Sequence, residues 1–219
     1  GEDSLSPIKR SLVLVKGTMT LQQAWAVFIF LLGAGLALSF VMSISVGLLA
    51  VGVSLIGLAY SHPWTRLKSR PCLDSLVNGI CYGTIPMLVG WSLFSGLSWQ
   101  AVCLSFPLFL IFASGHMLLG LPDREFDGSL GLRTTSVVLG YRTTVGVSVV
   151  FVALAIGVFV ILAVADWFPA RSLVVLPVLV SIEGLHVALF DESRVPRHFR
   201  NLRWLYAVLG VVFLVSLTF

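Results

Sequence analysis

Long apolar runs separated by short polar stretches dominate the chain. Each run is close to the ~20 residues that a helix needs to cross the hydrocarbon core of a bilayer. The first two runs are continuous and too long for one helix, so a tight hairpin is predicted near Ser39–Ser45. The pattern therefore predicts an all-α fold, a polytopic bundle of transmembrane helices. The predicted segments are Leu21–Phe40, Val41–Tyr60, Ser75–Phe94, Trp99–Leu119, Thr143–Ala165, Ala170–Phe190 and Leu202–Phe219.

The composition supports this class. Of the 219 residues, 58% are hydrophobic and 11% are charged, whereas a soluble domain has about 25% charged residues. The runs lack the alternation of a transmembrane barrel, and a bilayer offers no partner for open strand edges. One domain over residues 1–219 accounts for the pattern. Glycines along the first two segments predict close helix packing rather than catalysis: Gly33, Gly35, Gly47, Gly52 and Gly57.

The distribution of basic residues predicts the orientation of the bundle. Taken in order, the segments place residues 1–20, 61–74, 120–142 and 191–201 on one face of the membrane. With Arg203 just beyond, that face holds every Lys and Arg except Arg171. Because loop Lys and Arg mark the inner side, the polar loops are predicted to face the cytoplasm or its organellar equivalent. For the later arginines, topology alone explains the excess.

Two acids in the polar stretch after the fourth segment are candidates for a metal site. Asp123 and Asp127 are four residues apart, so a helical turn would bring both carboxylates to one side. Mg²⁺ prefers a few carboxylates plus phosphate oxygens to an all-protein cage. A solvated pair of loop acids is the alternative. The metal reading gains weight from the basic stretch Arg66–Arg70, which the even number of crossings places on the same face.

The basic stretch after the second segment is suited to phosphate. Arg66 offers a forked set of donors, and Lys68 offers a compact charge. Tyr60 ends its segment and can present a hydroxyl at the membrane boundary. An aromatic residue of the interfacial belt is the alternative for Tyr60.

These stretches resemble two motifs of the UbiA superfamily of intramembrane prenyltransferases. Tyr60-Ser-x-Pro63, followed by Arg66-Leu-Lys68, resembles the family's Y-S-x-P-x-R-L-K loop. Asp123-Arg-Glu-Phe-Asp127, followed by Gly131-Leu-Arg133-Thr-Thr-Ser and Leu139-Gly140, resembles its second aspartate-rich motif. The order of the motifs and the two segments between them also match, and the resemblance covers nearly the whole chain.

The resemblance implies a fold and a reaction. Members of the family are bundles of nine transmembrane helices that use Mg²⁺ to ionise an allylic prenyl diphosphate. The prenyl cation then alkylates an aromatic or other lipophilic acceptor. By this resemblance Asp123 and Asp127 hold the metal, Lys68 and Tyr60 act in catalysis with them, and Arg66 and Arg133 bind the diphosphate. Membrane lipid is the expected surrounding, and no nucleic-acid partner is expected.

The beginning of the chain departs from the family pattern. The first aspartate-rich motif should precede the first segment, but only Glu2-Asp3 is present there. Asp3 is therefore expected to be the last aspartate of that motif and a third metal ligand. The chain is expected to be a fragment that lacks two helices and has little activity alone. The residues encoded before Gly1 test this expectation. A third acid seen in many members has no counterpart, and His116 or Gly120 stands near its place.

Three polar residues lie within apolar segments. Glu183 and His186 are one turn apart, and an ionisable residue inside a membrane is costly enough to indicate function. Glu183 is a candidate for contact with the acceptor, and a mutually satisfied Glu183–His186 pair is the equally weighted alternative. Asn78 begins the third segment on the side of the polar stretches and is a candidate for lining the site.

Two other function classes remain open at this point. A membrane terpene cyclase would use the same metal and diphosphate residues, with the cation quenched internally, so the motifs do not separate it from a transferase. A non-enzymatic transporter would use the loop acids as vestibule charges. The transporter is disfavoured because the segments are too uniformly apolar to line a polar pathway.

Overall fold

The computed structural model describes residues 14, 16–167, 170–190, 204, 207, 208 and 211. Within these residues the secondary structure is helical and contains no strand, which confirms the predicted all-α class. The chain divides into two compact units, Gly1–Leu55 and Ile56–Phe219. The expectation of a single domain over residues 1–219 stays a prediction.

The first unit contains the predicted hairpin. Helix α1 spans Leu21–Met42, and helix α2 spans Ile44–Ser61 and continues into the second unit. Ser43 breaks the run with an extended backbone (φ −168°, ψ 159°). Its hydroxyl then accepts a hydrogen bond from the Val46 amide at 3.1 Å, so Ser43 caps the helix that follows. The hairpin predicted near Ser39–Ser45 is therefore confirmed, and the break is a serine cap.

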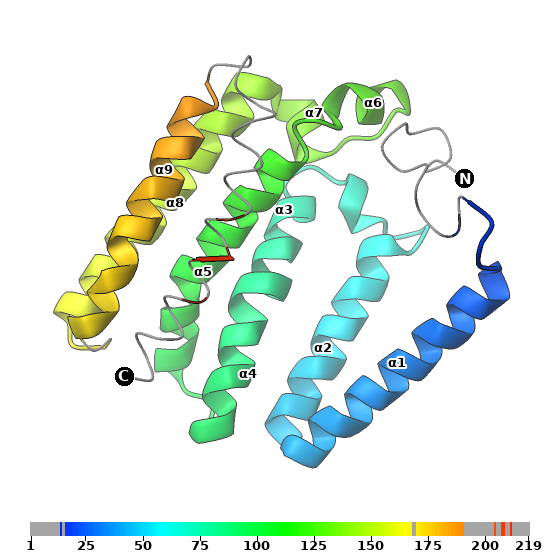
Figure 1. The fold of residues 1–219 in the computed structure, drawn as a ribbon, viewed down its shortest axis with the longest axis horizontal. Helices are drawn as coiled ribbons and strands as arrows, with labels where there is room; N and C mark the ends of the chain where they lie inside the picture. Colours follow the sequence, from blue (N-terminus) through cyan, green and yellow to red (C-terminus); the bar gives the residue numbers. More distant parts are fainter. Residues whose placement is uncertain are drawn as a thin grey trace. The chain divides into compact units, whose positions relative to one another are not determined.

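Three long helical spans form most of the second unit (Figure 1). The first is a continuous span, Leu73–Phe94, made of α3 (Leu73–Asn78), the π-helical η4 (Gly79–Thr84) and α4 (Ile85–Phe94). Helix α5 (Trp99–Leu119) and helix α8 (Tyr141–Val164) follow the predicted segments to within two residues. Between them lie two short helices, α6 (Arg124–Ser129) and α7 (Thr135–Leu139).

The sixth predicted segment is only partly an α-helix. Residues Ala170–Val175 form the 3₁₀ helix η5, and α9 begins at Leu176 and ends at Ala188. Pro177 stands in the first turn of α9, where its missing N–H costs no intrahelical hydrogen bond. The predicted segment Ala170–Phe190 is therefore helical up to Ala188, with a 3₁₀ start before the α-helix. The seventh predicted segment, Leu202–Phe219, lies almost wholly outside the described residues.

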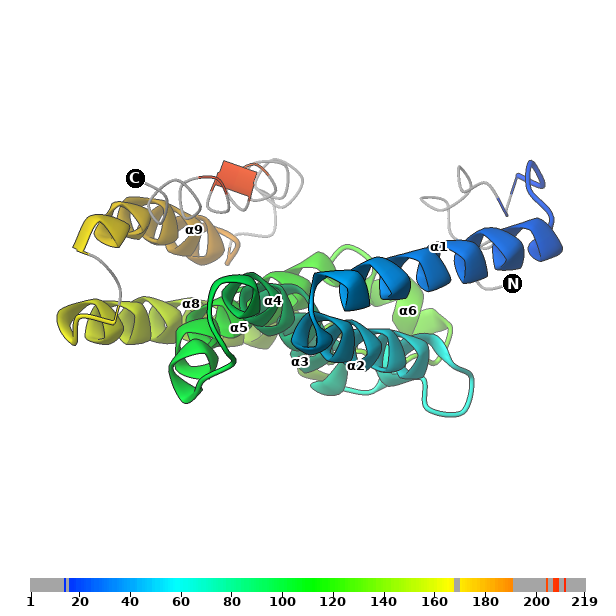
Figure 2. The same cartoon turned by 90° about the horizontal axis from the view of Figure 1, so that it is seen from below.

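The core of the second unit lies among α5, α8 and α9. Helix α9 packs against α8, as two views at right angles show (Figures 1 and 2). Ile111, Val145 and Ile182, one from each helix, are almost fully buried there. Other apolar side chains on these helices, among them Val102, Leu154 and Val180, are exposed, which suits a lipid surrounding. Five helical spans of the described chain are long and apolar enough to cross a membrane, and the protein is an integral membrane protein.

Close helix packing depends on glycines that the sequence did not single out. A Cβ atom at Gly83 would lie 2.6 Å from the Leu108 carbonyl oxygen, and one at Gly79 would lie 2.8 Å from the Phe109 carbonyl oxygen. The π-helical segment therefore packs directly on the backbone of α5. Of the five glycines predicted to pack closely, Gly47 lies against Phe40. The others meet no atom within 4 Å in the described part of the chain. They are Gly33, Gly35, Gly52 and Gly57.

Replacing Gly83 by alanine should destabilise the protein by about 1–3 kcal/mol, because the neighbouring backbone of α5 cannot move aside for a methyl group. Gly90→Ala is the matched control on the same span, since nothing lies within 4 Å of its added Cβ. The control should be neutral or stabilising by up to ~1 kcal/mol through helix propensity. Thermal unfolding in detergent micelles measures both changes. Equal stability of the two variants would contradict the close approach.

Candidate functional site

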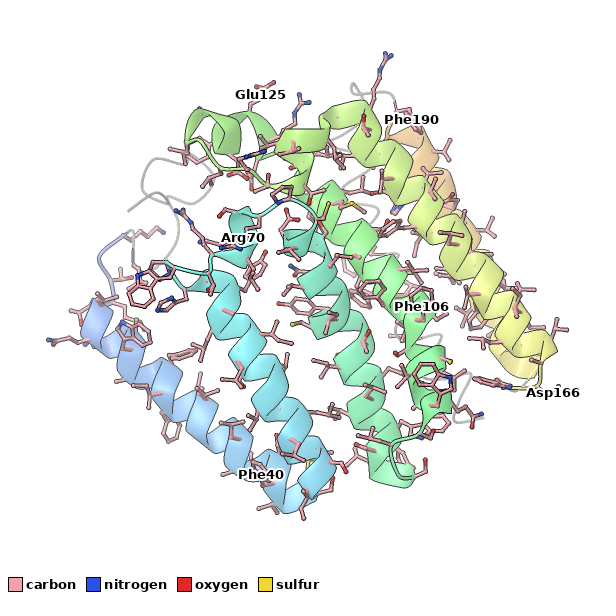
Figure 3. All side chains as sticks on the ribbon, turned by 180° about the vertical axis from the view of Figure 1, so that it is seen from behind. Phe40, Arg70, Phe106, Glu125, Asp166 and Phe190 are labelled. Atoms are coloured by element: carbon pink, nitrogen blue, oxygen red, sulfur yellow. The ribbon has the colours of Figure 1, made fainter. Side chains whose placement is uncertain are left out.

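The two polar stretches lie at the same end of the second unit. One connects α2 to α3, and the other runs from the end of α5 through α6 and α7 to α8. Figure 3 shows Glu125 and Phe190 at this end and Asp166 at the opposite end of α8. Two helical spans separate the stretches, as predicted: the span Leu73–Phe94 leaves this end and α5 returns to it.

The acidic pair occupies a single helical turn. The Asp127 amide donates a hydrogen bond to the Asp123 carbonyl at 2.8 Å, so the two residues lie one turn apart, as predicted. Both are partly exposed. After α6 the Leu132 amide donates to the Asp127 carbonyl at 3.0 Å. Gly131 has a φ of +70°, which a glycine adopts without steric cost, and this reverses the chain toward α7.

An aromatic contact anchors the acidic turn to the bundle. The Arg124 guanidinium lies 6.0 Å from the centre of the Tyr141 ring, within the range of a cation–π interaction. The Tyr141 hydroxyl donates to the Leu189 carbonyl at 2.7 Å. Arg124 therefore holds α6 against the start of α8, and Tyr141 holds that start against the end of α9. Arg124 serves the placement of Asp123 and Asp127.

The acidic turn fits magnesium only together with a substrate. Within the described residues no group of three or more acidic, histidine or cysteine side chains is placed to hold a metal. Asp123 and Asp127 supply two hard carboxylates, which suits an ion that takes its remaining ligands from phosphate oxygens and water. Asp3, the third predicted ligand, lies outside the described residues.

The basic stretch has an unusual backbone. Arg66 has left-handed angles (φ 39°, ψ 53°), and Cys72 also has a positive φ, 68°. Such conformations cost of order 1–3 kcal/mol each and persist where surrounding contacts enforce them.

The basic side chains differ in exposure. Lys68 lies on the short helix η3 (Leu67–Ser69) and is exposed, and Arg66 is half-buried. The loop has two residues between Pro63 and Arg66, one more than the family pattern. Arg133, in the other stretch, is exposed.

A buried carboxylate joins the two stretches. Asp74, at the start of α3, is only 3% exposed. Its oxygens accept a hydrogen bond from the Thr135 amide at 2.8 Å and a short hydrogen bond from the Thr135 hydroxyl. They also accept the Ser75 amide at 2.8 Å and the Ser75 hydroxyl at 3.3 Å. Four donors satisfy the carboxylate without a cation. We call the Asp74–Thr135 contact the clasp.

The clasp also fixes the strained end of the basic stretch. The Thr135 hydroxyl oxygen accepts the Cys72 amide at 2.7 Å, so the same threonine holds both Asp74 and Cys72. Thr135 belongs to the Gly131-Leu-Arg133-Thr-Thr-Ser motif, and Cys72 and Asp74 follow the Arg66-Leu-Lys68 motif. The hydrogen bonds of Thr135 therefore hold the two motifs beside each other. None of the charged residues of either motif takes part in these hydrogen bonds.

A second polar network surrounds Tyr60. Its hydroxyl lies 3.3 Å from Nε2 of His116 on α5, and it accepts a hydrogen bond from the Asn78 amide at 3.3 Å. The other ring nitrogen of His116 lies 3.4 Å from the Ser75 hydroxyl. Tyr60 and Asn78, both predicted as site residues, are thus in contact. His116 stood out in the sequence only as a residue near the place of a missing acid, and Asp74 did not stand out at all.

Glu183 lies apart from this network in α9. One of its carboxylate oxygens, Oε2, is buried and has no hydrogen-bond partner among the described residues, so the predicted pair with His186 does not satisfy this oxygen. His186 is fully buried, and its Nδ1 lies 3.4 Å from the Ser114 hydroxyl. An unpaired buried carboxylate oxygen is costly, which keeps Glu183 a candidate for contact with a substrate.

Comparison with known proteins decides the family. The family model described as the UbiA prenyltransferase family matches residues 1–208. The chain belongs to this family. A protoheme IX farnesyltransferase from Acaryochloris marina is 29% identical over 143 residues, 64% of this chain and 44% of that protein. A lycopene elongase/hydratase from Haloferax volcanii is 32% identical over 89 residues, 41% of this chain and 29% of that protein. The matched regions are thus less than half of these curated UbiA relatives.

Solved structures of UbiA homologues share the fold. The apo structure of a homologue from Aeropyrum pernix K1 has a TM-score of 0.76 at 20% identity and covers 98% of this chain and 79% of its own. A homologue from Archaeoglobus fulgidus, bound to GPP and Mg²⁺, has a TM-score of 0.75 at 19% identity and covers 100% and 79%. At these identities the likeness establishes the fold, and it confirms the UbiA-type helix bundle predicted from the two motifs.

A double-mutant cycle tests the clasp. Asp74→Ala and Thr135→Val should show a coupling energy of about 1.5–3 kcal/mol, the value of a hydrogen bond to a charged group. Thr134→Val is the matched control, because the Thr134 hydroxyl contacts Ser136 instead of Asp74. Its effect should add to that of Asp74→Ala. Unfolding in detergent micelles gives the free energies, and simple additivity of Asp74→Ala with Thr135→Val would contradict the clasp.

Proposed function

We propose that this UbiA-family chain forms the active-site part of an intramembrane prenyltransferase. The donor is an allylic prenyl diphosphate, and the acceptor is an aromatic or other lipophilic molecule. The clasp carries this proposal, because it holds an acidic turn and a basic loop at one end of an apolar bundle. A diphosphate needs both, since its charge must be met by cations and by a metal that carboxylates retain.

Acidic and basic residues have different roles in ionising the prenyl diphosphate donor. Asp123 and Asp127 would hold Mg²⁺, which when bound stabilises the negative charge of the leaving diphosphate. Arg66, Lys68 and Arg133 supply fixed positive charge to the diphosphate oxygens as the C–O bond breaks. The apolar helix walls exclude water from the prenyl cation and accommodate the prenyl chain. Preorganised charge at the polar end and dry surfaces behind it are the two requirements of the reaction.

The relatives support the chemical class of both substrates. The Archaeoglobus fulgidus homologue has been solved bound to GPP and Mg²⁺ and bound to DMAPP and Mg²⁺. The curated relatives are a protoheme IX farnesyltransferase and a lycopene elongase/hydratase. Both names describe large, hydrophobic acceptors. We infer an acceptor of that kind for this chain, with the partly buried Glu183 carboxylate as a hydrogen-bond partner for it.

Substituting the acidic turn tests the proposed reaction. The complete encoded protein, in detergent micelles with Mg²⁺, would be given radiolabelled farnesyl or dimethylallyl diphosphate and either protohaem IX, lycopene or a simple phenol. Prenylated product and diphosphate release would be measured separately. Asp123→Asn and Asp127→Asn should each lower Mg²⁺-dependent turnover at least 100-fold, because the metal loses an anionic ligand.

Glu125→Gln is the control for this experiment, since Glu125 lies between the two aspartates and is exposed. It should retain full turnover. Unchanged turnover in both aspartate variants would refute the metal site. Diphosphate release with a cyclic hydrocarbon as product, in the absence of any acceptor, would instead identify a terpene cyclase.

We also propose that the polar end faces the cytoplasm or its organellar equivalent, because the basic residues gather there. Single cysteines at Ser69 and Ser129 should react with a membrane-impermeant maleimide only after the membrane is opened, in right-side-out vesicles. A cysteine at Ser95, between α4 and α5, should react at once. The native cysteines are replaced first, because Cys72 is exposed. Opposite labelling of Ser69 and Ser129 would place the two motifs on different sides and exclude a joint site.

A further inference from the structure

Two neighbours, the Asp74 carboxylate and Nδ1 of His116, compete for the single proton of the Ser75 hydroxyl. A hydrogen bond to an ionised carboxylate is stronger than one to a neutral imidazole, so we assign this proton to Asp74. The contact between Ser75 and Nδ1 of His116 must then be donated by the ring. A neutral imidazole with its proton on Nδ1 has a lone pair on Nε2. The Tyr60 hydroxyl, 3.3 Å from Nε2, therefore donates to it.

This direction leaves the Tyr60 oxygen ready to receive a proton. Asn78 donates to one lone pair of the hydroxyl oxygen, and its amide is fixed by a second bond to the Asp74 carbonyl at 2.7 Å. No other partner of that oxygen is present in the described part of the chain, so its second lone pair is open. The hydroxyl proton is already directed at His116. Tyr60 is thus poorly placed to donate to a leaving diphosphate.

Tyr141 shows what a purely structural tyrosine looks like in the same bundle. It is buried and donates to a backbone carbonyl, that of Leu189. Tyr60 is half-buried at the polar end and donates to a basic nitrogen. His186, the other histidine within the described helices, is fully buried and cannot meet a substrate. Among the tyrosines and histidines of the described helices, the Tyr60–His116 pair therefore combines partial exposure at the polar end with a hydrogen bond to a basic nitrogen.

We propose that Tyr60 and His116 form the proton acceptor of the alkylation step, with Ser75 and Asp74 orienting the imidazole. This inference rests on the proposed prenyl transfer and assigns the base for it. The acceptor's π electrons form the new C–C bond to the prenyl carbon, which leaves a cation on the acceptor. A neighbouring C–H bond then breaks, and its electron pair restores the double bond or the aromatic ring.

The proton from that C–H bond passes to the Tyr60 oxygen as the Tyr60 proton passes to Nε2 of His116. The imidazolium that results keeps its Nδ1–H bond to Ser75, which in turn is bonded to the buried Asp74 carboxylate. The negative charge at the end of the chain stabilises the imidazolium. The proton returns through Tyr60 to water when the products leave, so the cycle consumes no further reactant.

The decisive experiment separates ionisation of the donor from loss of the acceptor's proton. In the complete encoded protein with Mg²⁺ and farnesyl diphosphate, His116→Gln should lower acceptor-dependent transfer about 100-fold or more, the usual contribution of a general base. Acceptor-free release of diphosphate should stay within about twofold of wild type, because proton removal is not part of ionisation. The acceptor probes are protohaem IX, lycopene and a simple phenol, whichever the wild type prenylates.

Further variants locate the effect. Tyr60→Phe should reproduce His116→Gln, and the double variant should be no worse than either, since both act in one transfer. His62→Gln, which replaces an exposed histidine at the variable position of the same loop, should behave as wild type.

Glu183→Gln should change KM for the acceptor more than kcat if Glu183 only binds the acceptor. A kcat loss of 100-fold in Glu183→Gln, with none in His116→Gln, would assign the base to Glu183 and overturn the proposal. A parallel loss of transfer and hydrolysis in His116→Gln would also overturn it.

A spectroscopic measurement keeps the inference testable apart from turnover. In protein labelled with ¹⁵N-histidine, His116 should show a protonated Nδ1 and an unprotonated Nε2, and Tyr60→Phe should shift the Nε2 resonance. A protonated Nε2 would overturn the relay even in an active enzyme. A wild-type protein that neither hydrolyses nor transfers the donor would refute the proposed function, whereas the tautomer would still report on the hydrogen bonds.

Discussion

The buried Asp74 carboxylate is the contact on which the polar end of the molecule depends. It is held by four donors, two from Thr135 and two from Ser75, and so needs no cation to remain buried. The hydrogen bonds of this carboxylate are short-range interactions, but they join segments that are far apart in the sequence. Residues 61 positions apart are fixed to each other at one end of the bundle. The charges of both motifs stand on segments that this contact holds in place.

Within the described residues, the polar groups of the site fall into two kinds, those with partners inside the protein and those without. Asp74 and Arg124 find their partners within the protein and serve as supports. Lys68 and Arg133 are exposed at the polar end, where the proposed diphosphate would meet their charges. A membrane protein can afford few uncompensated polar groups at depth, so those that remain mark where a ligand would complete them. The buried Glu183 oxygen is such a group in α9, within the described part of the chain.

Close packing of two helices brings the residues around Tyr60 together. Gly79 and Gly83 let the π-helical segment approach the backbone of α5 directly. This brings Asn78, just before that segment, close to the level of His116 on α5, so that both reach Tyr60. A larger residue at either glycine would separate the two helices that carry the network.

The sequence by itself determined the membrane class, the hairpin at Ser43, the span Trp99–Leu119 and the family. Apolar runs of bilayer length and charged motifs at fixed spacing are local properties that the chain displays directly. It also predicted Tyr60, Asn78, Asp123 and Asp127 as site residues from residue type and place, and these roles stay predictions. Only the tertiary structure decided that Asp74 joins the motifs, and that His116 receives the Tyr60 hydrogen bond. These contacts join residues 61 and 56 positions apart, and their meaning depends on side-chain direction, which a pattern of residue types does not record.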